Sequence, residues 1–212
     1  MRGKFITLEG IEGSGKSTQI AVLRDRLQAV GQRVVTTREP GGTPVAERLR
    51  DIVLNAGDDR ISPISELLIL FAARAIHLDT LIRPALERGE WVLCDRFTDA
   101  TYAYQGAGRG APEEAIRAMQ GLVHGGFQPD LTLLFDLPVE VGLARARARR
   151  GAQAADRFER EGREFFERVR ASFLDIARRE PARVRVIDAN RTPDEVAQAV
   201  VAALAQAGIL KS

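Results

Sequence analysis

Short apolar segments alternate along this chain with longer segments in which apolar residues recur every three or four positions. The apolar segments are rich in Val, Ile, Leu and Phe, and they predict β-strands at 5–8, 33–37, 91–94, 131–135 and 184–187. The periodic segments predict helices near 17–30, 43–55, 63–88, 98–106, 112–124, 138–150, 157–179 and 193–207. Strands that are apolar over most of their length and separated by helices indicate a parallel sheet with helices on both faces. We therefore expect a three-layer α/β fold around a five-stranded parallel sheet.

Length and composition restrict the class of protein. A chain of 212 residues, 45% hydrophobic and 28% charged, is sufficient for one α/β core, so we expect a single domain over 1–212. No apolar run approaches the roughly 20 residues that span a bilayer, and the first strand leaves no room for a signal peptide. The single cysteine, Cys94, lies in an apolar segment and suits a reducing compartment. These features predict a cytoplasmic protein without membrane contact.

Charge favours small anionic ligands over polynucleotides. The formal net charge is only +2, although 31 residues are Lys or Arg, so a general nucleic-acid-binding surface is not expected. Lysine is rare, with only Lys4, Lys16 and Lys211 in the chain, which draws attention to the position of Lys16.

A glycine-rich loop follows the first predicted strand. Gly10, Gly15, Lys16 and Ser17 have the spacing G-x-x-x-x-G-K-[ST], between an apolar strand and a periodic helix, as a phosphate-binding loop requires. Glycine lets backbone N–H groups approach a polyphosphate, Lys16 supplies a charge to its outer phosphates, and the Ser17 hydroxyl can bind Mg²⁺. We predict an ATP site at Gly10, Ile11, Glu12, Gly13, Ser14, Gly15, Lys16, Ser17 and Thr18.

The ends of the other strands carry further candidates, because ligands of parallel sheets gather at the carboxyl ends of the strands. Asp95 ends the apolar run 91–94, where a carboxylate commonly helps to hold Mg²⁺, and Arg96 next to it suits a phosphate. The alternative is that Asp95 and Arg96 merely close a loop. Arg38 and Glu39 form a second pair of opposite charges at a strand end.

Two helical faces combine aromatic and polar residues. Phe71 and Arg74 are three apart on a predicted helix and could stack on and hydrogen-bond a planar base, although a core Phe and a surface Arg would give the same pattern. Thr101, Tyr104 and Gln105 share a face of the next helix, where Gln105 could pair with a base edge.

An arginine-rich segment lies near 145–157, including Arg149 and Arg150. It could be a lid that closes over the transferring phosphate and neutralises charge in the transition state. A nucleic-acid-binding patch and a solvated helix face are the alternatives, and the phosphate-binding loop favours the lid.

Several of these motifs together resemble one family. They are the runs 8–18 (Leu-Glu-Gly-Ile-Glu-Gly-Ser-Gly-Lys-Ser-Thr), 37–43 (Thr-Arg-Glu-Pro-Gly-Gly-Thr), 71–74 (Phe-Ala-Ala-Arg), 95–96 (Asp-Arg), 103–106 (Ala-Tyr-Gln-Gly) and 129–132 (Pro-Asp-Leu-Thr). Over nearly its whole length the chain resembles bacterial thymidylate kinases. The resemblance implies a P-loop NTPase fold of the nucleoside-monophosphate-kinase type, a cytosolic homodimer, and transfer of the γ-phosphoryl group of ATP to dTMP with Mg²⁺, giving dTDP and ADP.

The resemblance also implies roles for individual residues. Phe71 would stack on the thymine, Arg74 would hydrogen-bond its carbonyl edge, and Tyr104 would exclude a ribose 2′-hydroxyl. Arg50 and Arg96 would hold the monophosphate, and Glu12 the region of the sugar 3′-hydroxyl. The implied substrate-binding set is Glu12, Glu39, Pro40, Arg50, Phe71, Arg74, Arg96, Thr101, Tyr104 and Gln105. The implied catalytic residues are Lys16, Arg96, Arg149 and Arg150, and the metal ligands are Ser17 and Asp95.

The sequence departs from some members of that family in the loop and the lid. Where some members carry an arginine within the phosphate-binding loop, this chain has Glu12-Gly13-Ser14, so its catalytic arginine would come from the lid. The lid segment 149–157 leaves the choice between Arg149 and Arg150 open. A kinase of another nucleoside or monophosphate, and a nucleotide-dependent switch or ATPase, are the alternatives that the loop alone also allows.

Overall fold

A five-stranded parallel sheet forms the centre of the protein. The computed structural model describes residues 2–55, 61–151 and 161–210, and for Arg150 its backbone alone. The strands are β1 (Phe5–Glu9), β2 (Val34–Arg38), β3 (Trp91–Asp95), β4 (Leu131–Asp136) and β5 (Val184–Asp188), in the spatial order β2-β3-β1-β4-β5. The predicted parallel sheet is confirmed: each strand ends one residue later than expected, and β2 also begins one residue later.

The strand register gathers charged residues at one edge of the sheet. In the register, Leu8 of β1 pairs with Asp95 of β3, and Glu9 pairs with Leu134 of β4. The last residues of the five strands are Glu9, Arg38, Asp95, Asp136 and Asp188, all at the same edge. Because parallel strands end together, residues far apart in the chain meet here.

Helices follow the strands as predicted. In the described part of the chain they are α1 (Lys16–Ala29), α2 (Pro44–Leu54), α3 (Pro63–His77), α4 (Arg83–Glu87), α5 (Thr98–Thr101), α6 (Glu113–His124), α7 (Val139–Arg150), α8 (Arg163–Arg179) and α9 (Pro193–Gln206). Local chemistry sets several starting points. Thr192 and Glu195 form a capping box at α9, and the Ser62 hydroxyl accepts a hydrogen bond from the Ser65 N–H at α3.

Three predicted helices differ from the expectation. The segment 63–88 is not one uniform helix, since a π-helical turn at Leu78–Ile82 joins α3 to α4. A second π-helical segment, Tyr102–Gly108, continues α5. Widened turns of this kind often occur at functional sites. Of the helix expected over 157–179, the part before residue 161 lies outside the described residues, and α8 begins at Arg163.

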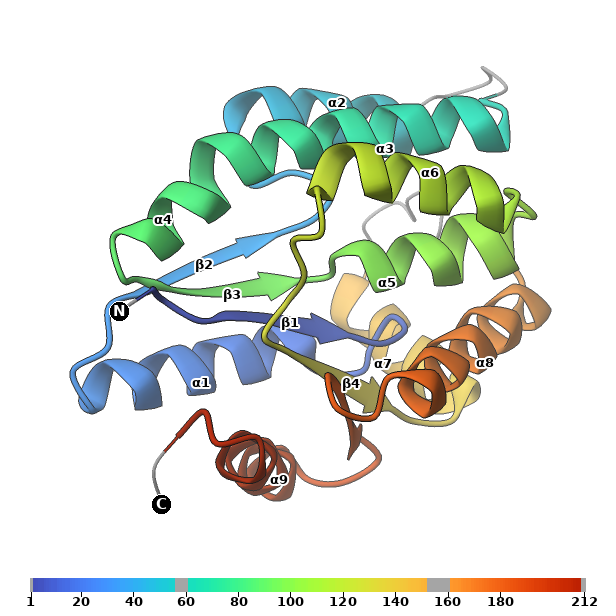
Figure 1. The fold of residues 1–212 in the computed structure, drawn as a ribbon. Coiled ribbons are helices and arrows are strands. Elements are labelled where there is room, and N and C mark those ends of the chain that lie inside the picture. Colours follow the sequence, from blue (N-terminus) through green and yellow to red (C-terminus); the bar gives the residue numbers. More distant parts are fainter. Residues whose placement is uncertain (1, 56–60, 152–160, 211–212) are drawn as a thin grey trace.

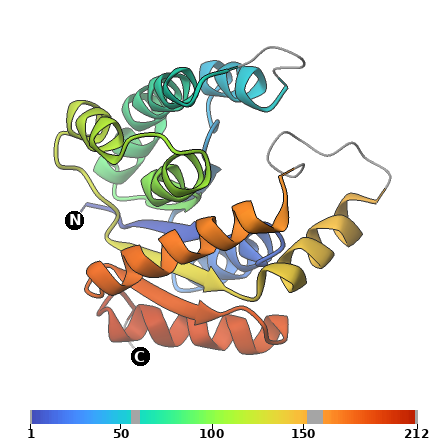
Figure 2. The ribbon, with the colours of Figure 1, turned by 90° about the vertical axis from the view of Figure 1, so that its right-hand side faces the viewer.

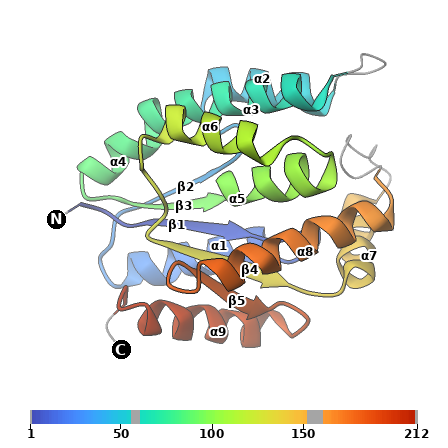
Figure 3. The ribbon, with the colours of Figure 1, turned by 45° about the vertical axis from the view of Figure 1, so that its right-hand side comes forward.

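The helices form layers around the sheet (Figures 1 and 3). One face carries α1 and α9, and the other carries α4, α5 and α8, with α3, α6 and α2 stacked outside them. Figure 2 shows α2 and α3 on one side of the strand ends and α7 with α8 on the other. The main core contains the strand residues Ile6, Leu8, Leu93 and Leu133, all fully buried. No helix in the described part of the chain is long and apolar enough to cross a membrane.

Candidate active site

The phosphate-binding loop connects β1 to α1. Gly10, Gly13 and Gly15 have φ angles of 134°, 73° and 88°, which glycine tolerates and other residues rarely adopt. At Gly13 a Cβ would lie 2.0 Å from the carbonyl oxygen of Gly142 in α7. A Cβ on Gly10 would lie 2.4 Å from the Phe135 carbonyl oxygen. Gly10 and Gly13 are therefore needed both for the backbone conformation of the loop and for its close packing.

Lys16 lies folded against this loop. Its Nζ donates to the carbonyl oxygens of Gly10 and Ile11, both at 3.0 Å, and to the Ser14 hydroxyl at 3.3 Å. Burial, together with the nearby Arg96 guanidinium, lowers the pKa of Lys16 to about 8. A phosphate oxygen, which carries a full charge, would be a stronger partner for this cation than neutral carbonyl oxygens.

Ser17 and Asp95 meet beside the loop, as predicted. The Ser17 hydroxyl lies 3.5 Å from Asp95 Oδ2, while Asp95 Oδ1 is buried and has no hydrogen-bond partner among the described residues. A hydroxyl and a carboxylate oxygen are suitable ligands for Mg²⁺. A bound Mg²⁺, or a water molecule on it, would give Asp95 Oδ1 the partner that it lacks. These two residues therefore fit the metal that the sequence implies.

The turn after β3 directs Arg96 toward the loop. Arg96 has a φ of 70°, and no other non-glycine residue in the described chain has a positive φ. The backbone N–H of the next residue, Phe97, donates a hydrogen bond to Glu9 Oε1 at 2.7 Å. Arg96 donates to the Gly10 carbonyl oxygen at 3.0 Å and to Glu12 Oε1 at 2.8 Å. Strained backbone at such a position indicates that the side chain's direction matters.

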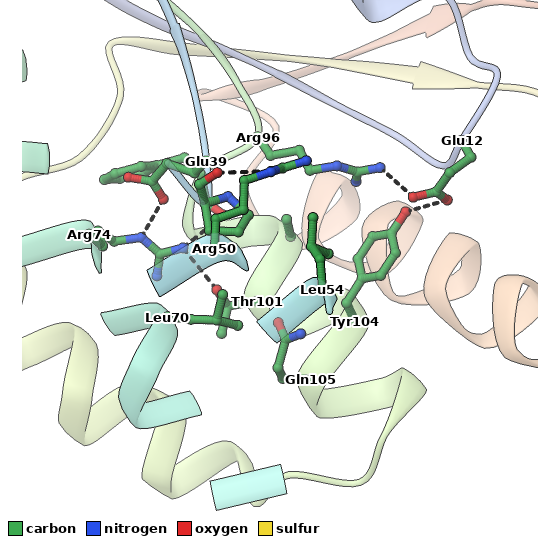
Figure 4. Close-up of a pocket in the computed structure, with 13 residues that line it drawn as sticks. Glu12, Glu39, Arg50, Leu54, Leu70, Arg74, Arg96, Thr101, Tyr104 and Gln105 are labelled. Atoms are coloured by element: carbon green, nitrogen blue, oxygen red, sulfur yellow. Dashed lines mark hydrogen bonds and ion pairs between the residues drawn. The ribbon is translucent and has the colours of Figure 1, made fainter. Parts of the chain in front are cut away.

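A cavity opens next to this arginine (Figure 4). It is lined by Glu12, Glu39, Pro40, Arg50, Leu54, Leu70, Arg74, Arg96, Phe97, Ala100, Thr101, Tyr104 and Gln105. At one end, Tyr104 donates from its hydroxyl to Glu12 Oε2 at 2.8 Å, and the Arg96 guanidinium stacks 4.6 Å from the Tyr104 ring. Arg50 donates to the Pro40 carbonyl oxygen at 2.8 Å. Two guanidinium groups thus border the cavity near the phosphate-binding loop.

Arg74 is held rigidly at the other end of the cavity (Figure 4). Its Nε donates to Glu39 Oε2 at 2.7 Å, and its Nη2 donates to the Thr101 hydroxyl at 2.9 Å. Burial alone would raise the pKa of the Glu39 carboxyl, but Arg74 and a hydrogen bond with His77 outweigh it and lower that pKa. Arg74 Nη1 is buried without a partner in the described chain. This leaves one N–H-bearing nitrogen available to a ligand.

The structure does not bring Phe71 to the cavity wall. Phe71 is 1% exposed and packs in a cluster with Leu67, Ala111 and Ile116. Leu70, four residues before Arg74, lines the cavity instead. Leu70 is four residues before Arg74 and Phe71 is three, and both spacings place a side chain on the same helical face as Arg74. Sequence periodicity therefore did not distinguish the two. Thymine stacking by Phe71 stays a prediction that this geometry does not favour.

Thr101, Tyr104 and Gln105 all line the cavity. The sequence did not single out the buried partners of these residues. Gln105 donates from Nε2 to Glu66 Oε1 at 2.8 Å, and Glu66 is fully buried. His77, also fully buried, links Glu39 to the Thr37 hydroxyl at distances of 3.0 and 2.7 Å. The available signal was a charged or titratable residue at an otherwise apolar helical position of α3.

The arginine-rich segment is described only in part. Arg149 is exposed at the end of α7, and Arg145 donates to the Ala189 carbonyl oxygen at 2.9 Å. Asp156 and Arg157, with the rest of 152–160, lie outside the described residues. The predicted lid residues Arg149 and Arg150 therefore keep their roles as predictions.

A phosphate-binding loop and an adjoining cavity lined by three arginines define a P-loop kinase that acts on a nucleotide. Comparison with known proteins agrees. The thymidylate kinase family model matches residues 8–200. The chain is 58% identical over 196 residues to a thymidylate kinase of Pseudomonas syringae pv. syringae, covering 92% of each chain. It is 58% identical over 200 residues to one of Pseudomonas fluorescens, covering 94% of each.

A solved structure gives the same result. The thymidylate kinase of Ehrlichia chaffeensis superposes with a TM-score of 0.77 at 34% identity, covering 97% of this chain and all of that one. This chain belongs to the thymidylate kinase family. It is an ATP-dependent nucleoside monophosphate kinase that converts dTMP to dTDP.

Proposed function

We propose that ATP binds along the phosphate-binding loop, that dTMP binds in the cavity of Figure 4, and that their reacting phosphates meet at Gly10. One observation carries this assignment. The carbonyl oxygen of Gly10 accepts hydrogen bonds from both Lys16 Nζ and Arg96 Nη1, each at 3.0 Å. The cation assigned to the donor phosphates and the one assigned to the acceptor phosphate are therefore neighbours.

The proposed acceptor site divides into a phosphate end and a base end. Arg50 and Arg96 hold the monophosphate, and Glu12 with Tyr104 borders the sugar. At the base end, Arg74 donates from Nη1 to the thymine C4 carbonyl, and Gln105 meets the neighbouring N3–H. Leu54 and Leu70 supply apolar wall around the ring.

The proposed reaction is a direct in-line transfer. The acceptor phosphate is already anionic near neutral pH, so it needs little help from a general base. Lys16, Arg96 and an arginine of the segment 145–157 position the two phosphates and neutralise their charge. Ser17 and Asp95 would hold Mg²⁺, which supplies further charge neutralisation when bound.

The wider setting belongs to the same proposal. We infer one domain, a cytoplasmic location and a homodimer. Two adjacent helices, α3 and α6, carry exposed apolar residues that suit an interface: Ile64 and Leu68 are 43% and 50% exposed, and Leu122 is 80% exposed.

An acceptor panel tests the proposed function. With ATP and Mg²⁺, the purified protein should phosphorylate dTMP with a higher kcat/KM than dUMP, dCMP, dGMP or the ribonucleotides, measured by separation of labelled products. Lys16→Ala should lower kcat by about 100-fold or more. Its circular dichroism spectrum should match the wild type. Near-normal turnover in this variant would contradict the mechanism, and phosphate release without a phosphorylated nucleotide would contradict the kinase assignment.

A further inference from the structure

The amide of Gln105 poses a question of orientation. A carboxamide offers an oxygen that accepts and a nitrogen that donates, and rotation by 180° exchanges them. At the edge of a pyrimidine this choice matters, because thymine presents N3–H as a donor whereas cytosine presents N3 as an acceptor. The group that holds Gln105 therefore decides which base edge it can bind.

Glu66 is that group. It lies on α3, is 0% exposed, and does not line the cavity. Its Oε1 accepts from Gln105 Nε2 at 2.8 Å, and its Oε2 lies 3.5 Å from Nη1 of Arg109. A guanidinium and an amide nitrogen can only donate hydrogen bonds, so both oxygens of the Glu66 carboxylate act as acceptors here. The amide nitrogen of Gln105 must therefore face Glu66.

We propose that Glu66 is a positioning residue that determines base specificity by fixing the Gln105 amide with its oxygen toward the base. The proposal rests on the assignment of the cavity to dTMP. Beside this acceptor, Arg74 Nη1 is a buried donor without a partner in the described chain. Together they form a donor–acceptor pair that complements the C4 carbonyl and N3–H of thymine. Cytosine offers an amino group and an unprotonated nitrogen at these two positions, so both contacts are mismatched.

The arrangement excludes the wrong base through buried polar groups. A site built around such groups rejects an analogue strongly, because the mismatched groups lose their hydrogen bonds away from water. Arg109 also pairs with Glu161 at 2.9 Å, so the Arg109 side chain has a second anchor. The ion pair between Arg109 and Glu66 is therefore itself held in place.

The test is the ratio of kcat/KM for dTMP to that for 5-methyl-dCMP, two acceptors that differ only at the pyrimidine edge. In Glu66→Gln the amide of residue 66 can donate or accept, so Gln105 can adopt either orientation. We expect the ratio to fall about tenfold or more, mainly through a higher KM for dTMP, with kcat for dTMP changed by less than about threefold. Loss of folded protein would lower both rates equally and leave the ratio unchanged.

A matched control removes a neighbouring charge and leaves the contact between Glu66 and Gln105. Glu161→Gln breaks the outer pair of Arg109, and we expect its ratio to stay within about twofold of the wild type. If Glu66→Gln is unstable because Arg109 loses one of its carboxylate partners, the double variant Glu66→Gln, Arg109→Gln neutralises both residues and should show the same fall. A ratio within twofold of the wild type in a folded variant would overturn the role of Glu66. A wild-type protein that shows no preference for dTMP would overturn the assignment of the cavity as well.

Discussion

Individual buried polar side chains give the cavity of Figure 4 its fixed shape. Arg74 is held by Glu39 and Thr101, and Glu39 is held by His77, so the guanidinium has one permitted orientation. Unpaired buried charges are costly, whereas a satisfied network is rigid. By the same rule, the one nitrogen of Arg74 without a partner in the described chain supports the proposed contact with a base.

His124, at the end of α6, gives a prediction at this scale. Burial, and then the nearby Arg74 guanidinium, lower the pKa of His124 to about 4, below its usual value of 6.5. Between these values the unfolded chain binds more protons than the folded protein, so the free energy of unfolding decreases as the pH falls from 6.5 toward 4. Above 6.5 this contribution does not vary.

Replacing His124 should reduce this pH dependence. From about pH 7.5 to pH 5, the wild type should lose roughly 1–2 kcal/mol more stability than His124→Gln, measured by urea denaturation at each pH. The glutamine keeps a polar group near the Thr98 hydroxyl, which lies 3.1 Å from His124 Nε2. Equal pH dependence in both proteins would show that His124 titrates normally.

At the scale of elements, the contact between the phosphate-binding loop and α7 requires two glycines, Gly13 in the loop and Gly142 in the helix. A Cβ on Gly142 of α7 would lie 2.7 Å from the Glu12 carbonyl oxygen and 2.9 Å from Ile11 Cδ1. Helix α7 carries the start of the arginine-rich segment, so under the proposed function its position relative to the loop would affect both nucleotides. Helix and loop are therefore coupled through backbone contact.

Gly142→Ala should separate these two elements slightly. We expect kcat/KM for ATP to fall by about tenfold or more, because small displacements of catalytic groups are costly. Gly121→Ala is the control, since Gly121 lies in α6 and a Cβ there meets no atom within 4 Å. That variant should keep full activity and be more stable by about 0.5–1 kcal/mol. Similar kinetics for the two variants would remove the argument for a coupled loop and helix.

The proposed interface on α3 and α6 gives the next prediction. Leu122→Asp introduces a charge on the exposed face of α6, and it should convert a dimer to a monomer in light scattering after size-exclusion chromatography. Val30→Asp is the matched control, because Val30 is 63% exposed but follows α1 on another face. A dimer that persists in Leu122→Asp would place the interface elsewhere.

In the whole molecule, the cavity proposed for dTMP and helix α7 lie on opposite sides of the strand ends. The cavity lies among α2, α3 and α5, whereas α7 and α8 lie on the opposite side (Figure 2). Phosphoryl transfer requires groups from both sides to act on one pair of phosphates. Helix α7 ends in Arg149 and Arg150, which places their backbone on the side opposite the cavity.

Alanine variants of these arginines test this division of labour. Arg149→Ala or Arg150→Ala should lower kcat by about 10- to 1000-fold while changing the Kd for dTMP by less than about threefold. Single-turnover kinetics and calorimetric titration measure the two quantities. Losses of the same size in dTMP binding and kcat/KM would instead identify these residues as contacts of the ground state.

Much of the fold follows from the sequence because its signals are local. Apolar runs predicted all five strands within one residue at each end, and Gly10, Gly15, Lys16 and Ser17 predicted the phosphate-binding loop. The resemblance to thymidylate kinases, which rests on contiguous motifs such as 37–43, is confirmed by the family comparison. These features depend on neighbours in the chain, so residue order alone determines them.

Only the tertiary structure decided which side chains meet. Periodicity placed both Leu70 and Phe71 near Arg74, and packing against Ile116 buried Phe71 while Leu70 faced the cavity. Glu66 is 39 residues from Gln105, and no local pattern joins them. Contacts of this kind depend on how the fold brings α3 and the π-helical segment Tyr102–Gly108 together. Residue order thus determined the glycine-rich loop with its Lys16, and long-range packing decided which polar groups line the cavity proposed for the base.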